Sequence, residues 1–205
     1  AGVALPVLAR TAAKAGRSGL EFYVGIPGSV GGAVRMNAGG HGSDTASVLS
    51  RAVVLNSETR MVDTKSADDL GFSYRHSDIV ASEIVVQAEF FTEPGNREII
   101  EAELRSITRW RKEHQPGGTL NAGSVFKNPV GEPAGSIIDR LGLKGTSVGS
   151  VTVSDVHANF LVATKDSTAS DIFAFVKEIQ GIVAARTGLV LEPEIEFIGE
   201  FGDPE

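Results

Sequence analysis

The sequence predicts an α+β protein built from two domains. Helical and strand patterns follow one another in mixed order along the chain, and neither type dominates. Near the middle, the string Gln-Pro-Gly-Gly at 115–118 interrupts regular structure. A chain of 205 residues is long enough for one large or two small domains with real cores. We therefore expect one domain at residues 1–115 and a smaller one at residues 116–205.

The first domain begins with an expected helix at residues 3–15, where Gly16 acts as a stop. After the glycine-rich stretch described below, residues 51–56 predict a strand whose hairpin partner would be 60–64. Residues 84–92 give the clearest strand of this half. Asn96 is placed to cap a following helix. Its apolar stripe, which indicates core packing rather than a cofactor site, comprises Ile99, Ile100, Leu104, Ile107 and Trp110.

In the second domain the pattern predicts a short helix at 134–141 and a buried strand at 158–164. Thr168 and Asp171 have the spacing of a capping box, which opens another helix that Gly188 would end. Residues 189–198 alternate in hydropathy and predict a closing strand. The apolar side of the long helix comprises Ile172, Phe175, Val176, Ile179 and Val183.

Composition excludes several classes of protein. The formal net charge of −7 argues against nucleic-acid binding, which needs a basic face. No apolar run approaches the about 18 residues of a membrane helix, and no secretory signal pattern is present. The chain has no cysteine, and its four histidines are scattered, so disulfides, thiolate chemistry and a metal site are not expected. These features are typical of a cytoplasmic protein without membrane or nucleic-acid partners.

The most informative stretch is residues 24–42, which is rich in glycine. Glycine lets a ligand approach the main chain, and consecutive N–H groups in such a loop can bind phosphate. The stretch matches neither standard nucleotide motif, so an irregular turn remains an alternative to a ligand cradle. Its glycines are Gly25, Gly28, Gly31, Gly32, Gly39, Gly40 and Gly42.

The string GIPGSVGGA followed by NAG resembles the flavin-binding segment of UDP-N-acetylenolpyruvoylglucosamine reductases. The resemblance covers essentially the whole chain, without a counterpart of the family's earlier glycine-rich segment. It implies a FAD-binding domain of the vanillyl-alcohol-oxidase-like type, with its N-terminal part missing, and then a smaller α+β substrate-binding domain. His41 stands where the family usually has tyrosine. The cofactor-binding residues implied are Gly25, Ile26, Pro27, Gly28, Ser29, Gly31, Gly32, Asn37, Ala38, Gly39 and Gly42.

A second motif is Tyr74-Arg75-His76-Ser77. By itself this string is most simply a surface arginine beside polar residues. It resembles the family's Tyr-Arg-x-Ser segment, which implies that Arg75 faces the substrate carboxylate and that Tyr74 contacts the substrate. A guanidinium suits that role because it is always charged and donates two parallel hydrogen bonds.

A third motif, AGSVFKNP at 122–129, resembles the signature of the family's substrate domain. The resemblance implies that Ser124 is the proton donor and that Lys127 and Asn128 contact the substrate. Without it, Ser124 would be a turn residue, and the other two would order the turn before Pro129. A hydroxyl is a weak acid, so Ser124 can donate only to a strongly basic acceptor such as a carbanion or enolate.

The chain's end, PEIEFIG at 193–199, resembles the family's ending and implies a catalytic role for Glu194. Glu192 is the competitor if the register differs, and alternating glutamates are otherwise the solvated face of a strand. Two shorter strings also match. LKG at 143–145 implies that Lys144 reaches a diphosphate, and HANF at 157–160 implies that His157 and Asn159 lie near the substrate.

Together, these resemblances imply an enzyme: an NADPH-dependent flavin oxidoreductase acting on a CH–CH bond. FAD would take electrons from NADPH and reduce the enolpyruvyl group of a UDP-sugar to give UDP-N-acetylmuramate, a step of peptidoglycan precursor synthesis and cell-wall biogenesis. Arg75, Ser124 and Glu194 would be catalytic, and the protein is expected to be monomeric. Two alternatives stay open. One is a flavin oxidoreductase of the same fold with another substrate, and the other is a catalytically silent nucleotide-sugar binding module.

Overall fold

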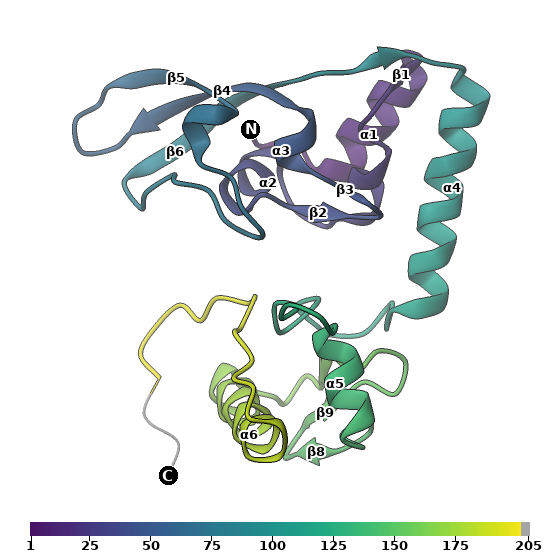
Figure 1. The fold of residues 1–205 in the computed structure, drawn as a ribbon, viewed down its shortest axis with the longest axis vertical. Coiled ribbons are helices and arrows are strands. Elements are labelled where there is room, and N and C mark those ends of the chain that lie inside the picture. Colours follow the sequence, from purple (N-terminus) through teal and green to yellow (C-terminus); the bar gives the residue numbers. More distant parts are fainter. Residues whose placement is uncertain (202–205) are drawn as a thin grey trace. The chain divides into compact units, whose positions relative to one another are not determined.

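The computed structural model describes residues 1–201 and divides into two units, Ala1–Arg111 and Lys112 onward (Figure 1). The division falls within helix α4 (Arg97–His114), just before the Gln-Pro-Gly-Gly string at which the sequence places the domain boundary. Each unit has its own buried hydrophobic core, and each is described here by itself.

The first unit has helical elements before, inside and after its glycine-rich stretch. Helix α1 has Pro6 in its first turn, where the missing N–H costs no hydrogen bond. Helix α2 lies inside the glycine-rich stretch, and a 3-10 turn precedes it. The helical elements are α1 (Leu5–Lys14), η1 (Glu21–Gly25), α2 (Val30–Met36), α3 (Thr45–Val48), η2 (Asp68–Leu70) and α4 (Arg97–His114).

The main sheet of the first unit is antiparallel, with strand order β5-β4-β6 (Figure 1). Strand β4 (Leu49–Asn56) is central and pairs with β5 (Val62–Ser66) and β6 (Glu83–Phe90). Two short ladders accompany it. Strand β1 (Arg17–Ser18) pairs with β7 (Glu93–Pro94), and β2 (Gly39–Gly40) pairs with β3 (Ser43–Asp44).

The predicted stripe of α4 is only partly buried. Ile100, Leu104 and Ile107 join the core that also holds α1 and the fully buried Tyr23. Ile99 and Trp110, by contrast, are 68% and 44% exposed. Residues 100, 104 and 107 recur at the spacing of one helical face, whereas 99 and 110 lie at the margins of that face. The expectation of a five-residue core stripe was therefore wrong at its two ends.

The second unit packs two helices against a small antiparallel sheet of order β10-β9-β8. Helix α6 begins at the predicted capping box, in which Thr168 Oγ1 and the Asp171 carboxylate exchange hydrogen bonds with each other's backbone N–H. It ends at Gly188, whose φ of 77° is left-handed. The elements are α5 (Ala134–Arg140), β8 (Ser147–Val148), β9 (Val151–Val153), β10 (Leu161–Ala163) and α6 (Ala169–Thr187).

The closing strand predicted at residues 189–198 does not form. The segment makes one isolated bridge, between Pro193 and Phe126, and its nearest backbone bonds are Lys127 N–H to Glu192 O and Glu194 N–H to Val125 O. Both bonds flank Pro193, so its nitrogen is not needed for this pairing, and the chain bends at 194–195 directly after the bridge. Alternating hydropathy indicates an extended segment with one side facing the core, but it does not show that the segment pairs with another strand.

Two other strands differ from the prediction, one displaced along the chain and one shorter. The hairpin partner of β4 starts at Val62 rather than at residue 60, because Arg60 has a left-handed φ of 60° within the turn. In the second unit β10 begins at Leu161, since the N–H of Phe160 donates back to His157 O and closes a turn over the predicted first residues. No helix in the described part of the chain is long and apolar enough to cross a membrane.

Candidate functional site

The glycine-rich stretch is a turn, a short helix and a hairpin rather than one continuous loop. Ser29 caps α2 by accepting a hydrogen bond at Oγ from Gly32 N–H, at 3.2 Å. Asn37 ends α2 in the left-handed region, with φ of 43°, a conformation that asparagine tolerates better than most residues. The chain then turns directly into the β2–β3 hairpin.

The backbone donors at the start of α2 are already used. Val30 N–H donates to Val3 O and Gly31 N–H to Ala1 O, both at 2.9 Å, while Gly32 N–H is bound by Ser29. The expectation that consecutive N–H groups of the stretch form a phosphate nest was therefore wrong for these three. Two of them instead hold the first residues of the chain against α2, and the third is capped by Ser29.

Several of the glycines serve internal packing. A Cβ at Gly25 would lie 3.0 Å from Ile107 Cγ2, and one at Gly39 would lie 2.8 Å from Asp44 Cβ. Other positions stay open. Gly28 has φ of 145° and Gly42 has φ of 83°, and a Cβ at Gly42 would meet no other atom within 4 Å. The backbone near Gly28 and Gly42 can therefore be approached by a ligand, which fits a bound flavin nucleotide.

The Tyr-Arg motif is attached to this stretch by side chains. Asn37 is buried, and its Nδ2 donates to Ser73 O at 2.9 Å while its Oδ1 accepts from Ala46 N–H at 2.9 Å. Ser73 and His76 close a tight turn in which Arg75 has φ of 54°. The Nη2 of Arg75 donates to Gly39 O at 2.9 Å. The predicted carboxylate clamp is thereby joined to the predicted cofactor segment.

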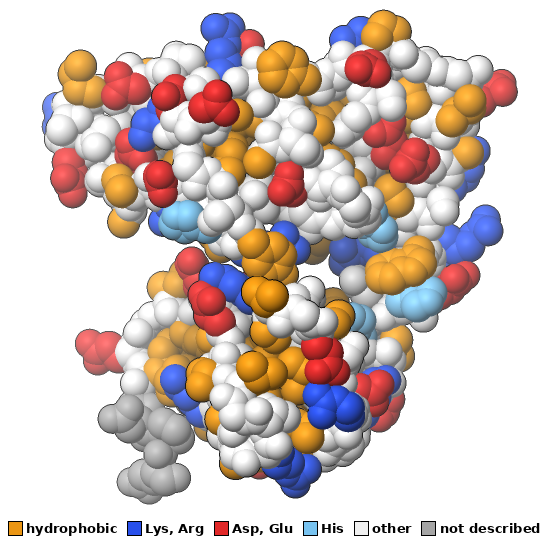
Figure 2. Space-filling model, viewed as in Figure 1, with side chains coloured by type: hydrophobic (Ala, Val, Ile, Leu, Met, Phe, Trp, Pro, Cys, Tyr) orange, Lys and Arg blue, Asp and Glu red, His pale blue; other side chains and the backbone are white. Residues whose placement is uncertain are grey.

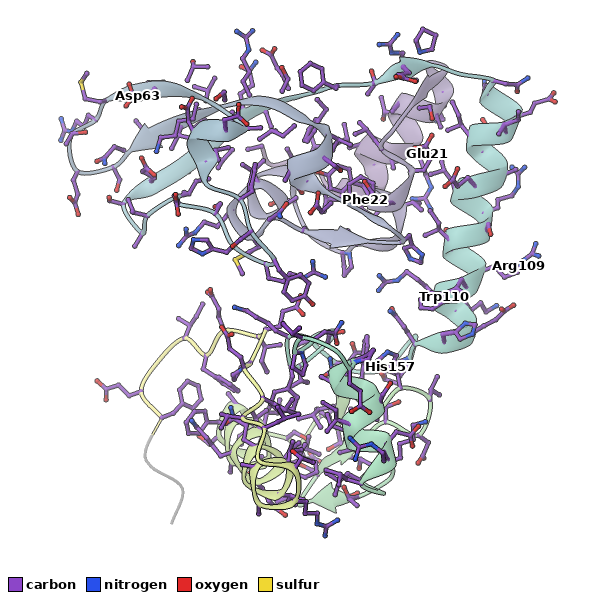
Figure 3. The ribbon with its side chains drawn as sticks, in the orientation of Figure 1. Glu21, Phe22, Asp63, Arg109, Trp110 and His157 are labelled. Carbon is purple, nitrogen blue, oxygen red and sulfur yellow. The ribbon has the colours of Figure 1, made fainter. Side chains whose placement is uncertain are left out.

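Sequence reasoning missed a cluster beside Gly25. Trp110 lies in the last turns of α4 (Figure 3), and its ring contacts the ring of His41 edge-on, with the two centroids 5.2 Å apart. Burial and the charge of Arg111 lower the pKa of His41, and burial lowers the pKa of Arg111. A Cβ at Gly25 would lie 3.1 Å from both Arg111 Cδ and His41 Nε2. No motif distinguishes Arg111 from its neighbours in the sequence.

In the second unit, a pocket of about 250 Å³ collects the predicted substrate residues. Four of them line it, and they come from three separate strings of the sequence: Ser124, Asn128, Lys144 and His157. Lys127 is not among its lining residues. The remaining lining residues are Pro133, Gly135, Ser136, Asp139, Val156, Ala158 and Asn159.

Asn159 fixes the segment that follows Ser124 through hydrogen bonds to its backbone. Its Oδ1 accepts from Phe126 N–H at 3.0 Å, and its Nδ2 donates to Phe126 O at 2.8 Å. The carbonyl of Asn159 also accepts from Val125 N–H, and Ser124 forms a bridge with Phe160. The amide is 3% exposed, so it fixes the backbone that carries Ser124.

His157 enters the pocket as a neutral donor. Its Nδ1 accepts from Asn159 N–H at 3.2 Å, which places the ring proton of the neutral form on Nε2. Burial and the charge of Lys144 lower the pKa of His157, so the neutral form is favoured. Gly135 leaves room for the ring, because a Cβ there would lie 3.1 Å from His157 Cε1. Figure 3 marks His157 beside α5.

One ion pair and one neutral hydrogen bond complete the second unit's site. Lys144 Nζ lies 2.8 Å from Asp139 Oδ2 at the pocket wall. Asn128 Oδ1 accepts from Ala134 N–H at 3.0 Å and so orders the start of α5. Asp139 was missed because an aspartate in the last turn of a short helix carries no sequence signal of its own.

The C-terminal glutamates differ in their surroundings. Glu192 forms an ion pair with Lys127, with Oε1 and Nζ 2.5 Å apart. Glu194 lies opposite Val125 through its backbone N–H, next in register to Ser124. The choice between Glu194 and Glu192 and the role of Glu194 stay predictions.

Charge is mixed over the surface. On the face shown in Figure 2, acidic and basic side chains are interspersed over the first unit. The pairs Arg51–Glu89 and Lys65–Glu83 are examples. No group of three or more acidic or histidine side chains that could hold a metal ion occurs among residues 1–201.

Comparison with known proteins assigns both units. Residues 1–65 match the family model of a FAD-binding domain, and residues 115–198 match that of the UDP-N-acetylenolpyruvoylglucosamine reductase C-terminal domain. The fold thus defines a FAD-binding domain followed by a reductase-type C-terminal domain, which confirms the α+β fold class expected from the sequence.

Individual relatives agree along almost the whole chain. A UDP-N-acetylenolpyruvoylglucosamine reductase of Synechococcus sp. (strain WH7803) is 47% identical over 97% of this chain and 66% of its own length. The reductase of Caulobacter vibrioides is 41% identical over 98% of this chain and 68% of its own. The crystal structure of the reductase from Thermus caldophilus superimposes with a TM-score of 0.82 at 37% identity, over 94% of this chain and 68% of that one.

The chain belongs to the UDP-N-acetylenolpyruvoylglucosamine reductase family. It spans about two thirds of the length of the curated relatives it matches, at 66% and 64% for two of them.

Proposed function

We propose that this chain carries out the NADPH-driven, FAD-dependent reduction of the enolpyruvyl group of UDP-N-acetylglucosamine enolpyruvate to UDP-N-acetylmuramate. The observation that carries the proposal is the pocket of the second unit, which unites Ser124, Asn128, Lys144 and His157 from separate strings of the sequence. FAD, when bound, supplies the transfer of an electron pair from NADPH to the substrate's double bond.

The first unit would hold the cofactor. The open backbone near Gly28 and Gly42 supports this role, together with the match of residues 1–65 to a FAD-binding domain. Gly25, Ser29, Asn37 and Gly39 would act mainly by shaping the segment. The other residues proposed to contact FAD are Ile26, Pro27, Gly31, Gly32 and Ala38.

Arg75 would hold the substrate carboxylate. One of its terminal nitrogens binds Gly39 O, and a guanidinium has further N–H donors for an anion. The same positive charge would stabilise the negative charge that develops next to the carboxylate during reduction. Tyr74 would contact the substrate from the same turn, since the Arg75 guanidinium lies 5.0 Å from the centroid of its ring.

Ser124 would deliver the proton. Reduction of an enolpyruvyl double bond leaves a strongly basic carbon, and transfer from the Ser124 hydroxyl then runs downhill. Asn159 supports the role because it fixes the backbone on both sides of Val125. Glu194, opposite Val125, would assist the transfer.

The nucleotide portion would be bound by Lys144 and His157. Lys144 supplies a point charge for the diphosphate, and His157 supplies a neutral Nε2–H donor beside it. Asn128 lines the same pocket, whereas Lys127 would act from its pair with Glu192. We further propose a monomer working in the cytoplasm, without nucleic-acid partners.

A second candidate is a nucleotide-sugar binding module without catalysis. The observation that favours it is the pocket of the second unit, whose lining residues all belong to that unit. Such a module would keep the pocket of the second unit and bind the UDP-sugar without turning it over.

One titration separates the two. The purified chain is mixed with FAD while flavin fluorescence is followed, and the complex is then treated anaerobically with NADPH and with the enolpyruvyl substrate. Saturable binding, bleaching by NADPH and return of the oxidised spectrum on adding substrate are expected. Binding of the UDP-sugar without any binding of FAD would instead favour the silent module.

A further inference from the structure

We propose that Asp139 is a positioning residue that holds the Lys144 ammonium at the pocket wall, ready to bind the phosphate oxygens of a nucleoside diphosphate. The inference deepens the proposed function and rests on it, because it names a residue that the substrate site would need. It starts from the ion pair of Lys144 Nζ with Asp139 Oδ2 at 2.8 Å, both partners lining the same pocket.

The connection between the two residues is fixed by backbone bonds. Asp139 lies in the last turn of α5, and Gly142 N–H donates to its carbonyl at 2.9 Å. Leu143 N–H donates to Ile138 O at 3.2 Å, and the Leu143 side chain is buried in the core. These bonds fix the position of the backbone just before Lys144, so only the orientation of the long Lys144 side chain remains to be set.

The pair is too exposed to be explained by stability. The side chain of Asp139 is 52% exposed and that of Lys144 is 32% exposed. Ion pairs in such surroundings contribute little to folding. What the pair does fix is the direction of a side chain that otherwise samples many rotamers.

The ammonium keeps donors for a ligand while paired. It has three N–H groups, and one bond to Asp139 leaves others for phosphate oxygens. His157 lies within reach of the same charge, since Lys144 contributes to lowering the pKa of His157. A charged and a neutral donor thus serve one end of the pocket, as a diphosphate requires.

A neighbouring pair offers a matched control. Arg140 Nη2 and Glu132 Oε2 are 2.8 Å apart, and this pair also joins α5 to the residues before it. Neither residue lines the pocket. The variant Glu132→Ala removes an exposed ion pair from the same helix without touching the proposed site.

The experiment compares the binding of UDP and of uridine, measured by calorimetry on the full chain. Asp139→Ala is expected to weaken UDP binding about two- to fivefold, the range of an exposed ion pair, and to leave uridine binding unchanged. Asp139→Glu should recover part of the loss. In the Lys144→Ala background Asp139→Ala should cost nothing further. Glu132→Ala should bind both probes like the unchanged chain.

Three outcomes would overturn the proposal. Unchanged UDP binding by Asp139→Ala would mean that the ion pair does not serve the ligand, and tighter binding would mean that the carboxylate competes with the phosphates. An equal loss for uridine, or an equal loss in the Lys144→Ala background, would mean that Asp139 only supports the fold. Failure of the unchanged chain to bind UDP would contradict both the proposed substrate and the role of the Asp139–Lys144 pair in binding it.

A ligand-free readout separates the pair from the substrate. The rate at which an amine reagent modifies Lys144, followed by mass spectrometry, is expected to rise in Asp139→Asn relative to exposed Lys177, because the bond to the carboxylate no longer occupies the ammonium. A rise without UDP binding would locate the error in the proposed function. No rise would show that Asp139 does not hold Lys144.

Discussion

Arg75 donates a hydrogen bond from Nη2 to the carbonyl oxygen of Gly39 at 2.9 Å. This bond joins two motifs that are separated by more than thirty residues in the sequence. The turn that carries Arg75 is also held by Asn37 at the end of α2. The direction of the guanidinium is therefore set by the same segment that is proposed to hold the flavin.

The first prediction concerns this bond. Arg75→Lys should leave FAD binding and flavin reduction by NADPH unchanged, and should slow reoxidation by the enolpyruvyl substrate about tenfold or more, since a lysine cannot bind Gly39 O and a carboxylate in the fixed geometry of a guanidinium. Stopped-flow absorbance of the two half-reactions measures both. Equal rates of reoxidation in the variant and the unchanged chain would contradict a carboxylate clamp.

Asn37 yields a prediction about stability. Asn37→Ala leaves Ala46 N–H and Ser73 O without their buried partner and should lower the free energy of unfolding by about 2–4 kcal/mol. Asn37→Gly loses the same bonds but accepts the left-handed backbone, and should recover about 1 kcal/mol. Urea unfolding of the three proteins tests the order. A glycine variant no more stable than the alanine variant would remove the backbone part of the argument.

A third prediction separates two hydroxyls of one pocket. Ser124→Ala should leave reduction of the flavin by NADPH intact and depress turnover of the enolpyruvyl substrate, because the proton donor is gone. Ser136→Ala, at the same pocket, should change KM more than kcat. Slowing of both half-reactions to the same extent by Ser124→Ala would contradict the proton-donor role.

The fourth prediction concerns pH. Burial and the charge of Lys144 lower the pKa of His157 below its ordinary value of 6.5, so below that value the unfolded chain binds more protons than the folded one. The free energy of unfolding should therefore fall as pH decreases from about 7.5 to 5.5, a window above the ordinary carboxyl pKa values. His157→Gln should flatten this dependence. His41, whose pKa is lowered mainly by burial, adds an effect of the same sign.

Local patterns were sufficient for the two long helices, α4 and α6, but not for α2 inside the glycine-rich stretch. The capping box at Thr168 and the stop at Gly188 mark the bounds of α6, and the spacing of Ile100, Leu104 and Ile107 marks the buried face of α4. These signals act within a few residues of one another, so they can be read in a single chain. The strand expected at 189–198 failed because a strand also needs a partner, and this segment pairs with the segment of Phe126 only at Pro193 before the chain bends at 194–195.

The sequence could predict the candidate site residues that belong to motifs, but not those that only tertiary packing brings to the site. Ser124, Lys144 and His157 were found from their strings, and all three line one pocket. Asp139 and Arg111 were not, because their importance comes from neighbours that only the fold supplies. The phosphate nest expected within residues 24–42 was wrong at residues 30–32 for a related reason, since two of these N–H groups bind the first residues of the chain and the third binds Ser29.

The hydrogen bonds of Asn159 to Val125 and Phe126 limit how the ligand specificity of the pocket can be changed. Its side chain and carbonyl hold the backbone of Val125 and Phe126, and a substitution at position 159 would remove the two side-chain bonds to Phe126, next to the segment that carries Ser124. We therefore expect a change of ligand preference at that residue to alter the position of Ser124 as well. Ser136, on the helix across the pocket, makes no such contact with the Ser124 segment among the described residues. Redesign for another nucleotide sugar should therefore begin on α5 and leave the Asn159 turn intact.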